Sequence, residues 1–478
     1  MQTIRRWTAG VIGVAAISTG VAVAQTPKAD QTMLREIYQQ LVEINTTDSV
    51  GDNTQAAQAM ATRLRAAGYP AADVQVLVPT GAPKKGNLIA RLHGTGERRP
   101  LLLLAHIDVV EAKREDWTRD PFKLVEENGY FYGRGASDDK SMASVFVQEM
   151  IRLKREGFKP NRDIILALTS DEELGGSSEY NGVEFLLRAH KNLIDAELAL
   201  NEGGGGRVTE NGKYERLHIQ VSEKIYQDYQ LQITNPGGHS SVPKPDNAIY
   251  QMSVALGKIA AFRFPMRLNE ATRTFFDRMS PISPGQVGAD MKAILTNPPE
   301  AAAVERLSAI PDLNAQLRTT CVATMIDGGH APNALPQRVR ANVNCRILPD
   351  EQPAAVEKTL AGVIGQGISI APVGRTTVSA GSPLKDDIMK PVEAVAAAMW
   401  PGVPVVPVMS AGGTDGRFLN NTGIRTYGVS GMFNPVDTNS HGLNERFRVA
   451  ALYEGQEFLY RLTKLLASGS TPSTGGQQ

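Results

Sequence analysis

Leu101-Leu102-Leu103-Leu104-Ala105-His106-Ile107-Asp108 is the stretch of sequence that decides the fold. Its first five residues form a continuous apolar run, which is typical of a strand buried on both faces of a sheet. His106 and Asp108 follow at its end, and side chains two residues apart on extended backbone lie on one face. The sequence therefore predicts a central strand that delivers a histidine and a carboxylate to its carboxyl end.

The segments around this strand alternate between strand and helix patterns. Helical periodicity covers 29–44, 54–67 and 142–156, and strand patterns cover 74–78, 87–92 and 163–169. Such alternation predicts an α/β/α catalytic domain with a mixed sheet between helical layers. The same pattern resumes from about residue 383.

The middle of the chain has a different pattern. Its predicted elements are a strand at 227–234, a helix at 247–261, strands at 319–326 and 337–347, and a helix at 353–364. This order predicts an inserted ferredoxin-like α+β module, with 263–318 as a long irregular insert inside it. The predicted organisation is a catalytic domain in two parts, 25–222 and 381–467, and an inserted lid or dimerisation domain at 223–380.

Bulk composition bounds the class of protein. At 478 residues the chain is too long for one ordinary core, which agrees with two domains. Lys+Arg and Asp+Glu both total 50, so no basic excess points to a nucleic-acid partner.

The first 24 residues have the pattern of a secretory signal peptide. Arg5 and Arg6 precede the small apolar run 7–21, and Ala22-Val23-Ala24 forms a cleavage site. A membrane anchor is the alternative, but the run is shorter than the roughly 20 residues that a bilayer helix needs. We expect a secreted or periplasmic protein cleaved after Ala24, with no stable membrane insertion afterwards. The tail 468–478 is Ser/Thr/Gly/Gln-rich and is expected to be disordered.

The chain has only two cysteines, Cys321 and Cys345. Both lie in strand-like runs on either side of a turn near Asn333, and two cysteines are too few for a disulfide framework or a cysteine zinc site. In an exported protein they could form one cross-strand disulfide. Two buried free thiols are equally compatible with the sequence.

Four further stretches place carboxylates or histidines in loops, three of them beside predicted strands or helices. They are Tyr132–Lys140, Ser170–Gly176, Leu200–Gly206 and Thr438–Glu445. Glu172 and Glu173 are adjacent and cannot point the same way, so one can bind metal while the other faces substrate. Three consecutive acids at a strand end are unfavourable unless cations compensate them. The glycine run Gly203–Gly206 lacks the Gly-Lys-Ser/Thr signature of a phosphate loop.

Together these stretches supply a ligand set of nitrogen and oxygen atoms without sulfur. Its members are His106, Asp138, Glu173, Glu202 and His441. Such a set suits two divalent ions, zinc first and Co²⁺ or Mn²⁺ as substitutes. If Asp138 bridges, each ion receives one histidine and one further carboxylate. Asp108 can then orient His106, and Glu172 is placed to act as the general base.

In this order and context the stretches resemble the co-catalytic zinc exopeptidase and amidohydrolase family. That family includes glutamate carboxypeptidase, carboxypeptidase S, aminoacylase, carnosine dipeptidases and succinyl-diaminopimelate desuccinylase. The resemblance extends over roughly Gln31 to Leu466 and implies the same five ligands, with Asp138 bridging and Glu172 as the base. One departure is Ser141, where the family loop usually has glycine.

The resemblance also implies a set of substrate-binding residues: His239, Asn333, Arg346, Gly413 and Thr414. In dimeric members of the family, the partner subunit supplies the histidine that corresponds to His239. The inserted domain could therefore form a homodimer. Arginine suits such a site because its guanidinium binds a carboxylate bidentately.

The predicted function is a carboxypeptidase-like, zinc-dependent metallopeptidase that hydrolyses the amide bond of peptides or N-acyl amino acids with a metal-activated water. Dipeptidase and aminoacylase activities on the same site remain alternatives. A catalytically inactive metal-binding protein is disfavoured because every ligand and base position is filled. Nucleophilic serine catalysis lacks a Gly-x-Ser-x-Gly elbow, and cysteine catalysis lacks a cysteine near a candidate histidine.

Overall fold

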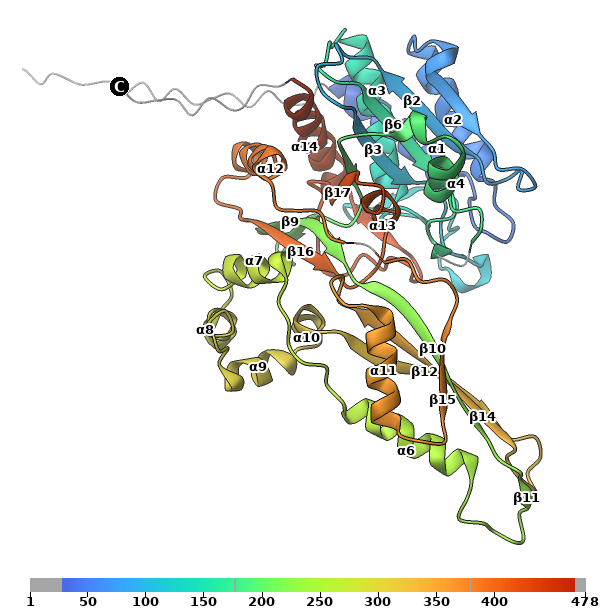
Figure 1. The fold of residues 1–478 in the computed structure, drawn as a ribbon. Coiled ribbons are helices and arrows are strands. Elements are labelled where there is room, and N and C mark those ends of the chain that lie inside the picture. The colour runs from blue at the N-terminus through green and yellow to red at the C-terminus, as the bar shows by residue number, and fades with distance from the viewer. Residues whose placement is uncertain (1–27, 176–177, 379, 469–478) are drawn as a thin grey trace, which may run out of the picture.

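A computed structural model describes residues 28–175, 178–378 and 380–468 (Figure 1). The predicted signal peptide and, apart from Ser468, the predicted tail lie outside these residues. Among the described residues, no helix has both the length and the apolarity that a bilayer crossing requires.

A mixed sheet forms the centre of the larger lobe, as predicted. In the described chain its order is β1-β2-β6-β3-β7-β17-β9-β8-β18, with β16 paired to β9. These strands are β1 (Val74–Leu77), β2 (Asn87–Leu92), β3 (Leu101–His106), β6 (Ile164–Thr169), β7 (Leu198–Asn201), β8 (Gly206–Val208), β9 (Tyr214–Glu223), β16 (Val405–Ser410), β17 (Arg425–Gly428) and β18 (Phe433–Asn434). β3 pairs in parallel with β6 and β7, whereas β1, β2 and β6 pair antiparallel.

Successive side chains of β3 enter two different cores. Leu101 and Leu103 pack in the larger one with helices α1 (Lys28–Glu43), α2 (Asn53–Ala66), α3 (Lys140–Arg155), α12 (Asp386–Met399) and α14 (Val449–Ser468). Leu102 and Leu104 pack in the other with α4 (Gly182–Ala189), α5 (Lys191–Ile194) and α13 (Gly416–Asn420). The apolar run is continuous because both faces of the strand are covered.

A second sheet forms an extension that projects from the larger lobe (Figure 1). Its antiparallel order is β12-β14-β10-β15, formed by β12 (Thr320–Gly328), β14 (Arg338–Ile347), β10 (Ile225–Thr234) and β15 (Ser369–Val373). Helices α6 (Ala248–Ala261) and α11 (Pro353–Ile364) complete a separate core with it. β11 (Gly238–His239) and β13 (Ala334–Leu335) pair at the far end. We call this unit the extension.

Cys321 and Cys345 form a disulfide between β12 and β14. They are register partners, so the two side chains face each other directly across the strand pair. The alternative of two free thiols is therefore wrong.

The prediction of an irregular insert at 263–318 is also wrong. The segment forms helices α7 (Glu270–Met279), α8 (Gly285–Ala293), α9 (Ala301–Ser308) and α10 (Pro311–Leu317). They enclose a small core around Phe276, Met291 and Leu307, which packs on Val406 of β16. Each helix is too short for its sequence to show a clear helical period. Asn269 and Thr272 nevertheless form a capping box that marks the start of α7.

Glu149 of α3 provides a test of the packing in the larger lobe. Its carboxylate is buried, and neither oxygen accepts a hydrogen bond in the described part of the chain. Burial raises the pKa of Glu149 to about 8, although Thr463 and Arg152 oppose the shift. The folded state therefore holds this proton more tightly than the unfolded state. Its stabilising contribution is complete below the unfolded pKa and is lost as the pH rises through about 8.

We expect Glu149→Gln to raise the melting temperature at pH 9 by about 2 °C or more, because no buried carboxylate then has to ionise. At pH 5 the variant and the parent should melt within about 1 °C of each other. Thermal unfolding followed by circular dichroism at both pH values measures the difference. An equal shift at pH 5 and pH 9 would contradict the assignment.

Candidate active site

Parallel pairing brings three of the predicted acidic or histidine stretches to one edge of the main sheet. His106 ends β3, the Asp171–Glu173 loop follows β6, and Glu202 follows β7. The carboxyl ends of parallel strands meet at the same edge, which is where α/β sheets bind ligands.

A small sheet brings in the remaining two. β5 (Tyr130–Tyr132) pairs with β19 (Arg446–Arg448), and β4 (Val125–Glu127) with β5. This pairing holds the loop before β19, which carries His441, against the loop after β5, which carries Asp138. The two segments are about 300 residues apart in the chain but adjacent in the fold.

The Asp138 carboxylate lies between two histidines. Its Oδ1 is 3.1 Å from Nε2 of His106, and its Oδ2 is 3.2 Å from Nε2 of His441. Oε2 of Glu173 is 3.0 Å from the same His441 nitrogen, and Oε2 of Glu202 is 3.8 Å from Nε2 of His106. The structure thus brings all five predicted ligands together in the arrangement that a bridging Asp138 requires.

The charges of this cluster are unbalanced in favour of carboxylates. Although burial opposes it, hydrogen bonds to His106 and His441 hold the pKa of Asp138 well below its usual range. Hydrogen bonds to Asp138 and Glu173 raise the pKa of His441 to about 10. Both pKa shifts have the same cause: carboxylates this close together are stabilised by positive charge between them.

Divalent ions fit this demand. Ligand atoms of His106, Asp138 and Glu173 lie within 4.8 Å of one another, as do those of His106, Glu172 and Glu202. Oε1 of Glu173 is buried without a hydrogen-bond partner in the described part of the chain. Nitrogen and oxygen donors without sulfur suit zinc, cobalt or manganese. The residues therefore suit divalent ions without selecting the metal, but these two groups divide the residues differently from the prediction: both contain His106, and the second contains Glu172 in place of Asp138.

Asp108 contacts His106, as predicted, and two further residues of the site. Nδ1 of His106 is 3.1 Å from the backbone carbonyl oxygen of Asp108, whereas its distance to the carboxylate is 3.6 Å. The carboxylate instead accepts hydrogen bonds from the backbone N–H groups of Glu172 and Glu173, at 3.2 and 3.0 Å. Asp108 thus contacts the imidazole through its main chain and its carboxylate, and the carboxylate also fixes the two glutamates.

Glu172 is buried beside the ligands. Burial raises the pKa of Glu172 well above its ordinary value, the charge of Glu202 adds to the rise, and His106 and Arg417 oppose it. A carboxylate whose pKa is raised above its ordinary value is suited to accept and return a proton. Arg417, in the first turn of α13 shortly after Thr414 and Asp415, was not singled out from the sequence.

Glu445 is a positioning residue that sequence reasoning missed. It is buried, and one carboxylate oxygen accepts from the backbone N–H groups of Ser137 and Asp138 at 2.6 and 3.0 Å. The other accepts from the N–H of Gly135 and from Arg134. One side chain therefore anchors the whole loop that presents Asp138. The only sequence signal was an acid four residues after His441.

Three of the predicted substrate residues lie together at the junction with the extension. Thr414 donates from its backbone N–H and its hydroxyl to Glu223, at 2.8 and 2.9 Å, and Gly413 precedes it. Arg346 donates to the carbonyl of Ala411 at 3.3 Å and lies over the ring of Tyr226. The end of β14 and the loop after β16 thus meet at one place.

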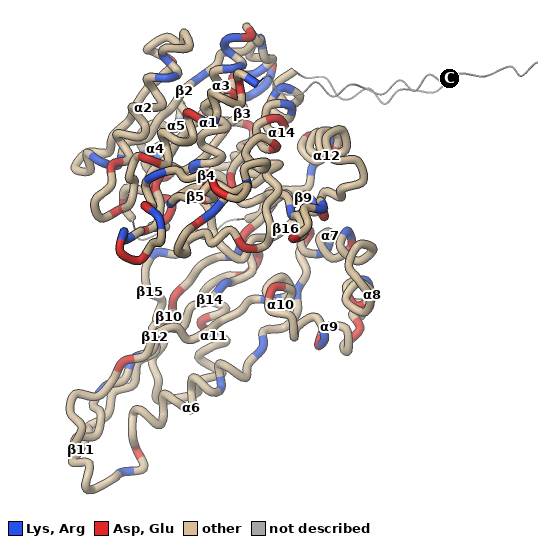
Figure 2. The backbone as a smooth tube through the Cα atoms, turned by 180° about the vertical axis from the view of Figure 1, so that it is seen from behind, with Lys and Arg blue, Asp and Glu red and all other residues tan. Residues whose placement is uncertain are grey.

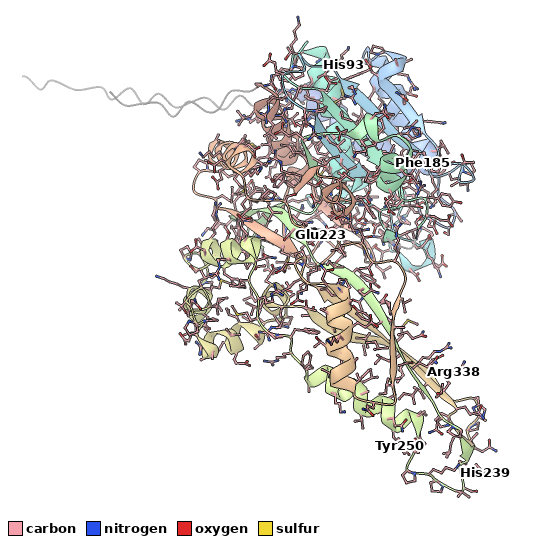
Figure 3. All side chains as sticks on the ribbon, viewed as in Figure 1. His93, Phe185, Glu223, His239, Tyr250 and Arg338 are labelled. Atoms are coloured by element: carbon pink, nitrogen blue, oxygen red, sulfur yellow. A yellow bond between two sulfur atoms is a disulfide. The ribbon has the colours of Figure 1, made fainter. Side chains whose placement is uncertain are left out.

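The other two lie at the opposite end of the extension. His239 is exposed on β11, and Asn333 lies beside it, accepting from the N–H of Ser240 through its carbonyl. Figure 3 shows His239 at the far end and Glu223 at the junction. Ten residues of extended β10 span about 33 Å, so His239 does not reach the metal ligands of its own chain in this structure.

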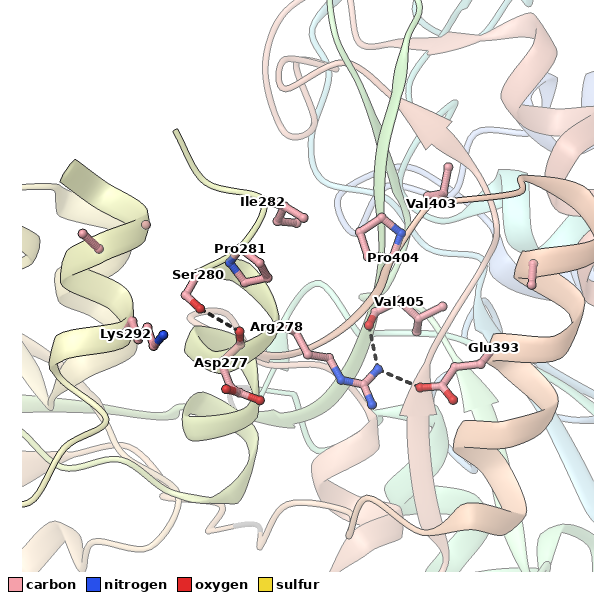
Figure 4. Close-up of a pocket in the computed structure, with 13 residues that line it drawn as sticks. Asp277, Arg278, Ser280, Pro281, Ile282, Lys292, Glu393, Val403, Pro404 and Val405 are labelled. Atoms are coloured by element: carbon pink, nitrogen blue, oxygen red, sulfur yellow. Dashed lines mark hydrogen bonds and ion pairs between the residues drawn. The ribbon is translucent and has the colours of Figure 1, made fainter. Parts of the chain in front are cut away.

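A cavity of about 890 Å³ lies elsewhere, between α7, α8, α12 and the start of β16. In it Arg278 donates to the carbonyl of Val405 and pairs with Glu393 (Figure 4). None of the candidate metal ligands lines it. Its charged groups serve to dock the helical insert on the larger lobe.

Residues 102–465 match the family model for Peptidase family M20/M25/M40. The chain belongs to this family. The mouse N-fatty-acyl-amino acid synthase/hydrolase PM20D1 is 28% identical over 76% of this chain and 73% of its own length. The probable carboxypeptidase S-like 2 of Dictyostelium discoideum is also 28% identical, over 77% of this chain and 71% of its own.

Solved structures share the fold. The M20 metallo-carboxypeptidase Sso-CP2 from Sulfolobus solfataricus has a TM-score of 0.65 at 20% identity, covering 91% of this chain and 99% of its own. The Bacillus subtilis YXEP protein, described as a dinuclear metal binding peptidase from the M20 family, has a TM-score of 0.58 at 12% identity, covering 92% and 99%. The predicted family and the mixed α/β architecture are therefore confirmed.

Glu445→Gln should weaken metal binding about tenfold or more, because an amide presents N–H groups to the backbone donors that hold the Asp138 loop. Competition between the protein and a chromophoric chelator measures the zinc affinity. Glu305→Gln, which neutralises an exposed glutamate on α9, is the matched control. Unchanged zinc affinity in a folded Glu445→Gln protein would show that the loop is held by other contacts.

Proposed function

We propose that this protein is a two-metal hydrolase that cleaves the amide bond of peptides or N-acyl amino acids next to a free carboxylate. The observation that carries the proposal is the Asp138 carboxylate between two histidines, with the buried Glu172 beside it. One ion would be held by His106, Asp138 and Glu202, and the other by His441, Asp138 and Glu173. Zinc is the first choice, with Co²⁺ or Mn²⁺ as substitutes.

The chain's own residues define the remaining chemistry. When bound, the two ions supply Lewis acidity toward a carbonyl oxygen and make water more acidic. Glu172 accepts the proton of the attacking water and returns it to the leaving amine nitrogen. Asp108 holds Glu172 in place through the backbone N–H of that residue.

The residues at the junction favour a substrate with a free carboxylate. Arg346 and the Gly413–Thr414 turn, which Glu223 fixes, lie together there, and the guanidinium is a suitable receptor for a carboxylate. The relatives include an N-fatty-acyl-amino acid hydrolase and a probable carboxypeptidase. We therefore propose carboxypeptidase-like cleavage as the main activity, with dipeptidase and aminoacylase activities as alternatives. A catalytically inactive metal-binding protein is disfavoured because Glu172 is retained.

We also propose that the extension is a ferredoxin-like lid through which two subunits pair. The strand order β12-β14-β10-β15 supports this topology. β12 is an edge strand with Val322, Met325 and Ile326 exposed, and α6, which packs beside it, exposes Tyr250 and Val254. Figure 2 shows few charges along α6. An exposed apolar edge of this kind is suited to pairing with a second copy.

Pairing would give His239 a function. Because His239 is distant from its own metal cluster, a partner subunit could carry it to the site, where its ring would stabilise the developing oxyanion or hold the substrate with Asn333.

The proposed division of the chain remains 25–222 with 381–467 for catalysis and 223–380 for the lid. The disulfide supports export to an oxidising compartment, the periplasm or the exterior.

Glu172→Ala should leave about two zinc ions bound per chain while lowering kcat by about 10³-fold or more, because no group then accepts the proton of water. Metal analysis and hydrolysis of a panel of dipeptides, blocked peptides and N-acyl amino acids measure the two quantities. Near-normal turnover in the variant would exclude Glu172 as the base. Activity that survives metal removal by a chelator would exclude the metal mechanism altogether.

His239→Ala and Glu172→Ala should each be inactive alone yet regain activity when mixed. In a mixed dimer one of the two sites has Glu172 from one chain and His239 from the other. Random pairing of equal amounts makes half of the dimers mixed, so activity of the mixture should return to about a quarter of the parent level. Co-refolding or co-expression of differently tagged chains, followed by hydrolysis assays, tests this. No recovery in verified mixed dimers would show that His239 does not act in trans.

A further inference from the structure

A polar pocket opens from the candidate metal cluster on the side that lacks the substrate-carboxylate residues. It has a volume of about 350 Å³, and Asp138 and Glu202 line one part of it. The glycine run Gly203–Gly206 and the segment from Ser430 to Ser440 contribute to its wall. Arg346, Gly413 and Thr414 are not among its lining residues. A substrate whose carboxylate sits at the junction and whose amide sits at the metals would therefore place its acyl group here.

Two basic side chains line the same pocket, Arg207 and His218. Arg207 donates to the carbonyl of Pro435 at 2.9 Å and forms no ion pair in the described part of the chain. Nε of Arg216, next to them, donates to Nε2 of His218 at 3.0 Å, and Arg216 contacts Glu215 at 3.4 Å. The two guanidinium groups thus flank one imidazole, with one acidic group as a salt-bridge partner.

The group formed by Arg207, Arg216 and His218 therefore has hydrogen-bond donors without acceptors among the described residues. Burial, together with Arg216 and Arg207, lowers the pKa of His218 to about 3, so the ring is neutral. Since Nε2 accepts from Arg216, the ring proton of the neutral form is on Nδ1, which has no hydrogen-bond partner among the described residues. Burial and the charge of Arg216 also lower the pKa of Arg207, although the charges of Glu215 and Asp312 oppose the shift.

The glycine run keeps the pocket polar and fixes its wall. A Cβ atom at Gly204 would lie 2.0 Å from the carbonyl oxygen of Gly428, and one at Gly206 would lie 2.1 Å from the ring of Phe433. The run is therefore required by close packing between strands, and it presents backbone rather than apolar side chains. Apolar residues also line the pocket (Met142, Met432, Pro435, Val436 and Phe447), so a preference for an anionic group depends on Arg207 and His218.

We propose that this pocket is an acyl-group subsite that binds an anionic end, the terminal carboxylate of a short dicarboxylic acyl group or the side chain of an acidic amino-terminal residue, through Arg207 and His218, whose ring accepts a hydrogen bond from Arg216. The inference rests on the proposed function and specifies its substrate class. A preference for an anionic acyl group would distinguish this protein from a hydrolase that prefers long-chain fatty acyl groups. A guanidinium group and a ring N–H are a suitable receptor for one carboxylate.

The test compares acyl groups that differ only at the far end. N-glutaryl-L-leucine and N-valeryl-L-leucine have the same number of acyl carbons, and the first ends in a carboxylate where the second ends in a methyl group. N-dodecanoyl-L-leucine represents the fatty acyl class. With the zinc-loaded full-length protein, kcat/KM for the glutaryl substrate should exceed both others by about tenfold or more. Direct binding of glutarate against valerate, by calorimetry, provides a readout independent of turnover.

Arg207→Gln should remove this preference by lowering kcat/KM for the glutaryl substrate about tenfold while changing the valeryl value by less than about twofold. Arg207→Lys should keep part of the preference, because it retains the charge. Arg263→Gln, which removes an exposed arginine of the helical insert, is the matched control. Zinc content and melting temperature of each variant identify any loss caused by misfolding.

The outcomes separate this inference from the proposed function. Hydrolysis of all three substrates without a glutaryl preference, or equal losses for glutaryl and valeryl in Arg207→Gln, would overturn the subsite and leave the hydrolase intact. If neither these three substrates nor the wider panel of dipeptides, blocked peptides and N-acyl amino acids is hydrolysed, the proposed function fails. Calorimetry then tests the subsite by itself. Tighter binding of glutarate than valerate that Arg207→Gln abolishes would support it, and equal binding would overturn it.

Discussion

Concentrated negative charge at the edge of the main sheet is the constraint on which the site depends. The ends of β3, β6 and β7 and two loops bring Asp138, Glu172, Glu173 and Glu202 within reach of only two histidines. Such a cluster is unfavourable without cations, and a set of nitrogen and oxygen donors is the natural place for divalent ions. The rest of the larger lobe can be understood as the scaffold that holds these carboxylates together.

That scaffold works largely through backbone N–H groups. The Asp108 carboxylate accepts hydrogen bonds from the backbone N–H groups of Glu172 and Glu173. The Glu445 carboxylate accepts them from those of Ser137 and Asp138. Because carboxylates accept several hydrogen bonds at fixed geometry, a buried acid can set the shape of an entire loop. Two acids that bind no metal in this scheme thus decide where the metal-binding acids point.

The junction and the pocket divide the surroundings of the cluster into two chemically different sides. At the junction, Glu223 fixes the Thr414 turn beside Arg346, and the helical insert packs against β16, which leads into that turn. On the other side, Gly203–Gly206 bring Arg207 and His218 into the pocket wall. The two sides therefore depend on different parts of the chain, one on the extension and the other on the main sheet.

The sequence by itself determined the strands and helices with strong periodicity, the five candidate ligands and Glu172. These are local signals: an apolar run fixes a buried strand, and a polar cluster directly after it must lie at the sheet edge. Helices of seven to ten residues at 270–317 gave too weak a period to be recognised. Only the tertiary structure decided the disulfide, the hydrogen bonds of Asp108, the role of Glu445 and the distance of His239 from the cluster. Each of these depends on contacts between distant segments, for which the local pattern of residues contains no information.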